Sequence, residues 1–155
     1  MISIRPVSRS DAAAWLRLRR GLWPDGSAAE HRVEIEAFFA GSAAEPLAVI
    51  LAEDSLGHVI GLAELSTRPT AEGCRSRHVA YLEGLYVVPE ARRRGAARAL
   101  VAAAEKWARA RGCSELASDA AMTNDASAAA HRSLGFDEVG LIRCFRKELQ
   151  APASA

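Results

Sequence analysis

Apolar residues recur along the chain at two different spacings, and each spacing predicts a type of element. Residues 2–7 alternate apolar and polar positions, as a half-buried strand does. Trp15, Leu18 and Leu22 then follow at helical spacing, so a first helix is predicted before the turn at Trp-Pro-Asp-Gly. Residues 27–40 begin with a Ser-x-x-Glu capping box, which predicts a second helix up to the next glycine.

The central part of the chain is typical of antiparallel strands. Residues 46–53 and 59–66 are apolar-rich and are separated by the turn Asp-Ser-Leu-Gly, which predicts a hairpin. Residues 81–88 form a third apolar run, and the three strands suggest an antiparallel meander. The polar, irregular stretch 68–77 between them is predicted to be an exposed loop.

The C-terminal half alternates strands and helices. Strand 81–88 leads through a turn and a loop to an alanine-rich helix, and a short strand at 114–119 should lie parallel to it. A fourth helix is predicted over 124–133, followed by closing strands up to about residue 148. We therefore expect an α/β (α+β) fold with four helices on a mixed central sheet of about seven strands. The expected organisation is a single domain over 1–149 with a frayed tail at 150–155.

Composition and charge exclude several classes of protein. The chain has 155 residues, a quarter of them charged, and a formal net charge of +1, which argues against nucleic acid as the main partner. No run reaches about 18 apolar residues, so no membrane segment is predicted. The three cysteines and the scattered histidines lack metal-ligand spacing, so we assign no metal. An odd number of cysteines makes a disulfide framework unlikely, so we expect a reducing compartment and a cytoplasmic location.

The loop before the alanine-rich helix has the features of a phosphate-binding site. Its residues fit the pattern Arg/Gln-x-x-Gly-x-Gly/Ala, in which small residues bring backbone N–H groups close to an anion at a helix start. The loop differs from the nucleoside-triphosphatase type because no Gly-Lys-Ser/Thr follows the glycine. The residues are Arg92, Arg93, Arg94, Gly95, Ala96 and Ala97.

This loop resembles the acetyl-coenzyme A signature of the GCN5-related N-acetyltransferase superfamily. Ala97 stands where glycine is commoner, a departure that the pattern tolerates. Further motifs, in order over residues 81–149, are similar to those of the aminoglycoside 6'-N-acetyltransferases. They are Leu-Glu-Gly at 82–84, Pro-Glu at 89–90, Gly-Cys at 112–113, Ala-Ser-Asp at 117–119, and His131 before Leu-Gly-Phe at 134–136.

The resemblance implies the element order β-α-α-β-β-β-α-β-α-β-β and an enzyme that acetylates the 6'-amine of aminoglycosides, conferring antibiotic resistance. It implies acetyl-coenzyme A as co-substrate, a polycationic amino sugar as substrate, and a homodimer in which residues 139–145 pair across the interface. Backbone groups of the phosphate loop would hold the pyrophosphate, and the strand before it would bind the pantetheine arm. The implied cofactor-binding residues are Leu85, Tyr86, Val87, Arg92, Arg93, Arg94, Gly95, Ala96, Ala97, Arg98 and Asn124.

Four side chains are candidates for the acetyl transfer, and each has an alternative interpretation. Glu83 is a charged residue in an apolar strand, and it either accepts the proton of the substrate amine or forms a structural salt bridge to an arginine. Asp119 either binds the amino sugar or caps a turn, and the proton could pass to it or to water instead. His131 stands where the family carries a tyrosine that protonates the thiolate, or it is only packed. Trp23 is either a plate for a sugar ring or a core lid.

Other functions stay open at the level of sequence. A related enzyme could acetylate a polyamine or a protein N-terminus, and a non-catalytic module could bind acetyl-coenzyme A or the drug. An acyl-enzyme on Cys113 or Cys144 is disfavoured because neither has a histidine close in sequence, although partners could meet in space. We expect direct attack of the amine in a ternary complex.

Overall fold

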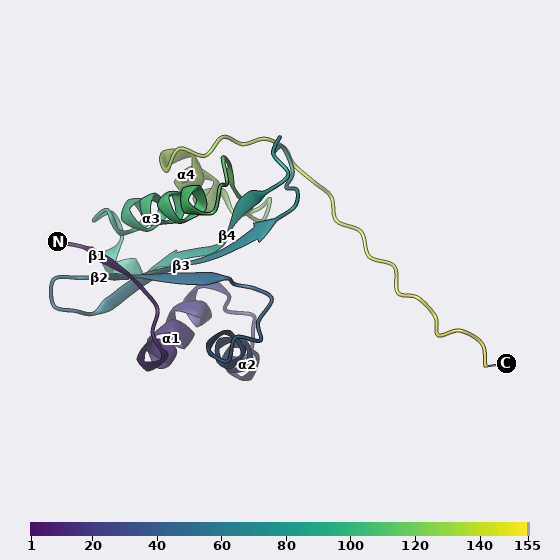
Figure 1. The fold of residues 1–155 in the computed structure, drawn as a ribbon, viewed down its shortest axis with the longest axis horizontal. Coiled ribbons are helices and arrows are strands. Elements are labelled where there is room, and N and C mark those ends of the chain that lie inside the picture. The colour runs from purple at the N-terminus through teal and green to yellow at the C-terminus, as the bar shows by residue number, and fades with distance from the viewer. Residues whose placement is uncertain (155) are drawn as a thin grey trace.

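Five strands form one mixed sheet in the computed structural model, which describes residues 1–154 (Figure 1). The strands follow one another across the sheet in chain order, and neighbours are antiparallel except for the last pair, which is parallel as predicted. The strands are β1 (Ser3–Pro6), β2 (Ala48–Glu53), β3 (Val59–Arg68), β4 (Val79–Val87) and β5 (Leu116–Ser118).

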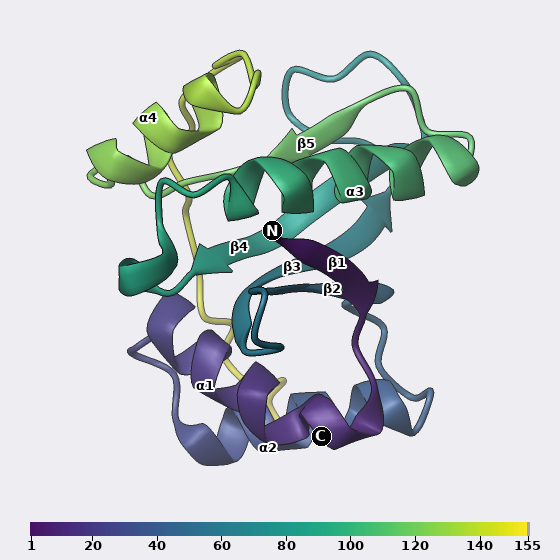
Figure 2. The ribbon, with the colours of Figure 1, turned by 90° about the vertical axis from the view of Figure 1, so that its left-hand side faces the viewer.

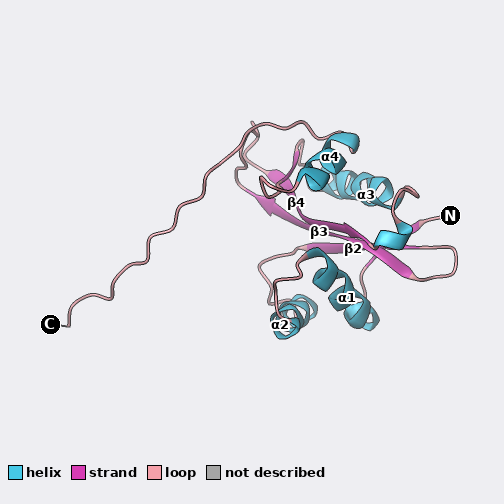
Figure 3. Cartoon of the chain, turned by 180° about the vertical axis from the view of Figure 1, so that it is seen from behind, coloured by secondary structure: helices cyan, strands magenta, loops and turns pink. Residues whose placement is uncertain are grey.

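Helices cover both faces of the sheet (Figures 1 and 3). Helices α1 (Ala12–Leu22) and α2 (Ala28–Phe39) lie on one face, and α3 (Ala96–Ala110) and α4 (Asp125–Ser133) lie on the other. Two short 3-10 helices, at Arg9–Asp11 and Pro89–Ala91, precede α1 and the phosphate loop.

The predicted apolar stripes form the core. Trp15 and Leu18 of α1 are fully buried, and Ile35 of α2 is 2% exposed. The predicted capping box is present, because Ser27 Oγ accepts the Glu30 N–H at 3.1 Å and Glu30 Oε2 accepts the Ser27 N–H at 3.0 Å. Local sequence therefore sets the start of α2, and burial of its inner side fixes α2 on the sheet.

A buried ion pair lies between α1 and the sheet. Glu64 of β3 accepts Trp15 Nε1 at 2.6 Å and Arg19 Nε at 2.7 Å on Oε1, and it accepts Arg19 Nη2 at 2.8 Å on Oε2. The Arg19 guanidinium also pairs with Glu34 of α2 and lies 5.3 Å from the centre of the Trp23 ring. Both carboxylate oxygens are hydrogen-bonded, as a buried charge requires.

A β-bulge interrupts β4 at Glu83. Gly84 pairs with Glu64 and Leu82 pairs with Leu65, so Glu83 is an extra residue with no partner across β3. A bulge of this kind re-aims side chains. Here Gly84, like Tyr81, pairs with a residue on the α1 side of the sheet, and Glu83 contacts Arg68 of β3 on that same side. Two consecutive residues, Glu83 and Gly84, therefore face α1.

The prediction of closing strands up to about residue 148 is wrong for the single chain, and the sheet has five strands instead of about seven. Residues 137–154 form no strand, and beyond Val139 the chain extends away from the body (Figure 1). Val139 lies against Gly73 of the β3–β4 loop, and beyond it Phe145 is 92% exposed. A strand needs a neighbouring edge, and the chain leads away from β5 at this point. The predicted frayed tail at 150–155 continues this course to residue 154, and Ala155 lies outside the described residues.

Candidate active site

Strands β4 and β5 separate at the predicted place. Their parallel pairing runs from Ala80 opposite Leu116 to Leu82 opposite Ser118 and ends there. Past this point, residues 83–87 of β4 have no strand on their β5 side within the described chain. On this edge the backbone N–H and C=O of Leu85 and the N–H of Val87 are free to pair with an extended ligand, whereas Tyr86 pairs with Leu62 of β3 and Val87 O accepts Arg92 Nε.

The phosphate loop ends in a glycine whose conformation other residues rarely adopt. Gly95 has a φ of 88°, and nothing lies within 4 Å of the position that a Cβ would take there. The first hydrogen bond of α3 runs from Ala99 N–H to Gly95 O, so the amides of Ala96, Ala97 and Arg98 have no acceptor inside the helix. Open space in front of free amides at a helix start suits an anion.

The three arginines of the loop are exposed and differ in their contacts. Arg92 Nε donates to Val87 O at 2.9 Å, and its guanidinium lies 5.7 Å from the centre of the Tyr86 ring. Arg93 has a φ of 61°, an unusual value for a non-glycine residue. Arg92 therefore fastens the loop to β4, and the backbone of the loop is left to face a ligand. Figure 2 shows that the end of β4, the start of α3 and the end of α1 lie on one side of the molecule.

Glu83 is paired with Arg68, a residue that no sequence motif singled out. Arg68 Nη2 lies 2.8 Å from Glu83 Oε2 and 3.0 Å from Oε1, and Arg68 Nε lies 3.3 Å from Oε1. Burial raises the pKa of Glu83 above its ordinary value, while Arg68 acts in the opposite direction. The alternative interpretation of Glu83, a salt bridge to an arginine, describes this contact correctly.

Asp119 is connected to the same cluster through Tyr81. The Tyr81 hydroxyl donates to Asp119 Oδ2, and the Arg68 guanidinium lies 3.5 Å from the centre of the Tyr81 ring. Burial and this hydrogen bond raise the pKa of Tyr81. The structure thus brings Glu83 and Asp119 into one cluster, with Arg68 and Tyr81 between them. Sequence reasoning missed these two linking residues because their side chains carry no motif.

His131 lies at the carboxyl end of β5. Its Nδ1 donates to Ser127 O at 2.7 Å, its Nε2 lies 2.8 Å from Ser118 Oγ, and its ring meets Phe136 edge-on at 5.3 Å. Asn124 Oδ1 accepts the Ser127 N–H at 3.0 Å and caps α4. Both side chains therefore have structural contacts in addition to the roles that the sequence suggested.

Trp23 packs beside Glu83. A Cβ on Gly84 would lie 2.9 Å from the Trp23 ring, so the indole covers this glycine directly. The indole also contacts His31 of α2, whose ring is stacked on it with the ring centres 6.4 Å apart. Trp23 keeps an intermediate exposure, so part of the ring is open to a ligand next to the bulge.

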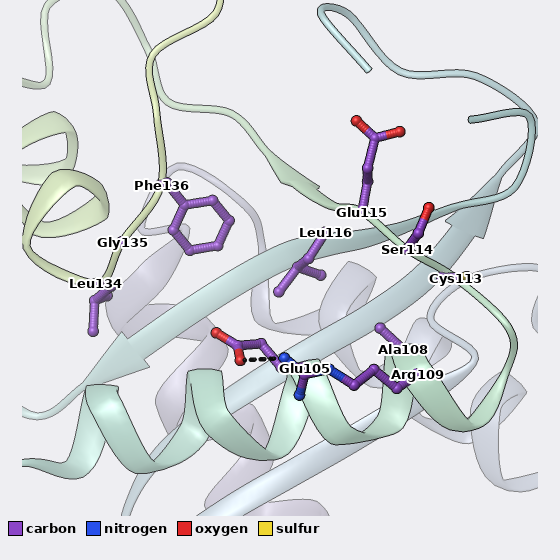
Figure 4. A pocket seen from close by; sticks show the side chains of 10 residues that line it. All are labelled: Glu105, Ala108, Arg109, Cys113, Ser114, Glu115, Leu116, Leu134, Gly135 and Phe136. Atoms are coloured by element: carbon purple, nitrogen blue, oxygen red, sulfur yellow. Dashed lines mark hydrogen bonds and ion pairs between the residues drawn. The ribbon is translucent and has the colours of Figure 1, made fainter. Parts of the chain in front are cut away.

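A cavity of about 270 Å³ lies apart from this cluster, between α3, β5 and the chain after α4 (Figure 4). Its lining includes Ala108, Leu116, Leu134 and Phe136, with Glu105 and Arg109 at its rim.

Over the described part of the chain, no three histidine, cysteine or acidic side chains gather as metal ligands. No helix within residues 1–154 has the length and apolar content needed to cross a membrane.

The family model described as "Acetyltransferase (GNAT) family" matches residues 13–136. Among curated proteins, the aminoglycoside N(6')-acetyltransferase type 1 of Klebsiella aerogenes is 56% identical over 146 residues, which cover 94% of this chain and 96% of that protein.

Solved structures agree with these sequence matches. The structure of AAC(6')-Iy in complex with the bisubstrate analogue CoA-S-monomethyl-acetylneamine superposes with a TM-score of 0.87 at 34% identity, over 96% of this chain and 99% of that one. The aminoglycoside 6'-N-acetyltransferase AAC(6')-Ih from Acinetobacter baumannii superposes with a TM-score of 0.88 at 37% identity, over 97% of this chain and all of that one.

Proposed function

The chain belongs to the acetyltransferase (GNAT) family, and from this premise we propose that it transfers the acetyl group of acetyl-coenzyme A to the 6'-amine of aminoglycosides. The strongest support is the 56% identity, over nearly the whole chain, to a protein named for that reaction. A solved relative at 34% identity holds an analogue that joins coenzyme A to an acetylated amino sugar. We assign this activity to a single domain over residues 1–149.

The co-substrate binds, in this proposal, along the opening between β4 and β5. The backbone from Arg92 to Arg98, with Gly95 at its centre, holds the pyrophosphate. The β4 edge at 85–87 pairs with the pantetheine arm, and Asn124 adds a contact through its amide. The unpaired strand edge and the free amides of α3 fit these tasks.

Glu83 carries the proton transfer. An alkyl ammonium cannot attack until it loses a proton, which the Glu83 carboxylate accepts directly or through a water molecule. The amine nitrogen then attacks the thioester carbon, whose oxygen is stabilised by the backbone N–H of Leu85. The C–S bond breaks, the nitrogen releases its second proton to water as the amide forms, and the departing thiolate takes a proton from His131. The attack is direct, within a ternary complex.

Asp119 and Trp23 select the amino sugar. Two carboxylates acting on one amine would stabilise the ammonium that must be lost, so we assign Asp119 to a second amine or hydroxyl of the same rings. Trp23, next to the bulge, provides an apolar plate for a sugar ring. Acetylation removes a positive charge from the drug, and we expect expression in a susceptible bacterial cytoplasm to confer resistance.

A thiol-release assay tests this function. With acetyl-coenzyme A present, aminoglycosides that carry a free 6'-amine should release coenzyme A, and analogues with a 6'-hydroxyl should not. Release with polyamines or peptides alone would favour the other amine acetyltransferases. Tight binding of the drug without thiol release would instead indicate a binding module.

We also propose a homodimer in which the C-terminal arm, residues 137–149, pairs with the β5 side of the partner. The arm exposes five large apolar side chains, which a lone chain leaves in water. The structural alignments with the two solved relatives cover 96% and 97% of this chain, so most residues of the arm are included in the aligned regions. The exposed residues are Val139, Leu141, Ile142, Phe145 and Leu149, from 62% to 92% exposed.

The cavity of Figure 4, with its apolar floor, lies where such an arm would add to the sheet. Light scattering on the purified chain should give about twice the mass of 16.6 kDa. Phe145→Asp should give the monomer mass, whereas Leu56→Asp, at an exposed turn distant from the arm, should not change the wild-type value. A monomeric wild-type chain would contradict this assembly.

A further inference from the structure

The positively charged side chain of Arg68 occupies the two groups, Glu83 and Tyr81, that the ammonium group of the proposed substrate would contact. Its guanidinium donates to both oxygens of Glu83 and lies 3.5 Å from the centre of the Tyr81 ring. A carboxylate and an aromatic face are the two kinds of group that bind an ammonium ion. An amine that approaches Glu83 must therefore compete with Arg68.

The positions of the two partners allow Arg68, and not Glu83, to move. Arg68 is the last residue of β3, next to the exposed loop 69–78, and its side chain is 38% exposed. Glu83 is fixed in the bulge of β4, and its side chain is only 18% exposed. Arg68 has a long, flexible side chain that can turn into solvent without breaking any backbone pairing.

We propose that Arg68 is an internal competitor of the substrate: it occupies the ammonium position at Glu83 in the free enzyme and is displaced when the aminoglycoside binds. This inference rests on the proposed function, in which Glu83 receives the reacting amine. Every amine must displace the same guanidinium, so Arg68 weakens the binding of all of them by the same factor. Only some substrates make further contacts elsewhere.

The surrounding charges favour a polycation in this competition. Glu45 acts electrostatically on both Arg68 and Glu83, and Asp119 lies on the other side of Tyr81. A substrate with several ammonium groups can pair with Glu45 or Asp119 while it displaces Arg68. A monoamine gains only the contact to Glu83, so it should bind more weakly than a polycation both in the wild-type enzyme and in a variant without Arg68.

The test compares Arg68→Ala with the wild-type enzyme at saturating acetyl-coenzyme A and pH 8. The substrates are one aminoglycoside with at least four amines and one monoamino sugar, a 6-amino-6-deoxyglucoside. We expect the KM values of both substrates to fall by a similar factor, about fivefold on the scale of a partly exposed ion pair. Calorimetric Kd values should change in the same direction.

Two further variants serve as controls. Arg68→Lys keeps a cation at this position and should retain both wild-type KM values more closely than Arg68→Ala. Arg77→Ala removes a positive charge from the neighbouring loop 69–78, where Arg77 is exposed and has no ion pair among residues 1–154, and should leave both KM values unchanged. Melting curves verify that all variants fold.

A higher KM for both substrates in Arg68→Ala would overturn the inference, because it would mean that Arg68 positions Glu83 for the amine. Unchanged KM values for both substrates would overturn it as well. These outcomes differ from failure of the proposed function, in which the wild-type enzyme itself would release no thiol with any aminoglycoside.

Discussion

Removing the carboxylate of Glu64 should destabilise the fold strongly, because it leaves a buried cation behind. The side chains of Glu64 and Arg19 are 2% and 3% exposed, and Glu64 accepts three hydrogen bonds from Trp15 and Arg19. Breaking such a buried pair from one side costs about 3–5 kcal/mol, which is a large part of a typical total of about 5–15 kcal/mol. Glu34 still pairs with Arg19 but is 57% exposed, so Glu64→Ala should lie within this range.

The assay is thermal and urea denaturation of Glu64→Ala, Arg19→Met and a double variant with Glu64→Leu. At about 2–4 °C per kcal/mol for a chain of this size, Glu64→Ala should lower Tm by about 6–20 °C. The double variant should recover much of the loss, because no unpaired charge stays buried. A loss below about 1 kcal/mol in Glu64→Ala, or a double variant as unstable as the sum of the singles, would refute this reasoning.

The remaining predictions concern the site and the dependence on pH. Gly95→Val should raise the KM for acetyl-coenzyme A far more than that for the amine, because a φ of 88° disfavours any side chain; equal effects in steady-state kinetics would count against the phosphate loop. Glu83→Gln should lower kcat by about 10²-fold or more and remove the acidic limb of the pH profile. In the wild-type enzyme this limb should lie above the ordinary pKa of a glutamate, because burial raises the pKa of Glu83; an unchanged profile in the variant would exclude Glu83 as the base. The hydrogen bond from Arg5 lowers the pKa of Asp11, so its ionised form adds stability above pH of about 4 that is lost as pH falls toward the lowered value. Asp11→Asn should therefore cost stability at pH 7 and less at pH 2, as urea denaturation would measure. Cys113→Ala should keep most activity, and a trapped acetyl-cysteine would contradict direct attack.

Features that depend on neighbours in sequence were predictable. The capping box at Ser27, the buried stripe of Trp15 and Leu18, and the loop that ends at Gly95 are each encoded within a few residues. The parallel direction of β5 followed from chain connectivity, because a strand reached through a helix returns in the same direction. The approximate positions of all four helices were therefore recognisable from the sequence.

Features that depend on partners distant in sequence were not predictable. Arg68 meets Glu83 across 15 residues, and neither side chain carries a signal that names the other. The apolar segment 139–145 is typical of a strand, but its sequence does not say whether a free edge lies within reach of the same chain. The contacts of His131 to Ser118 and Ser127 also appear only once α4 packs beside β5.

The bulge at Glu83 makes the site depend on the number of residues in β4 as well as on their identity. Deleting Leu82 or Glu83 would let β4 pair with β3 without interruption, and the sheet itself would tolerate such a change. The carboxylate would then be lost or would turn to the α3 side, away from Trp23 and Arg68. Substitutions in the neighbouring side chains can alter which amines are accepted, whereas insertions and deletions in this strand would abolish the chemistry in a protein that still folds.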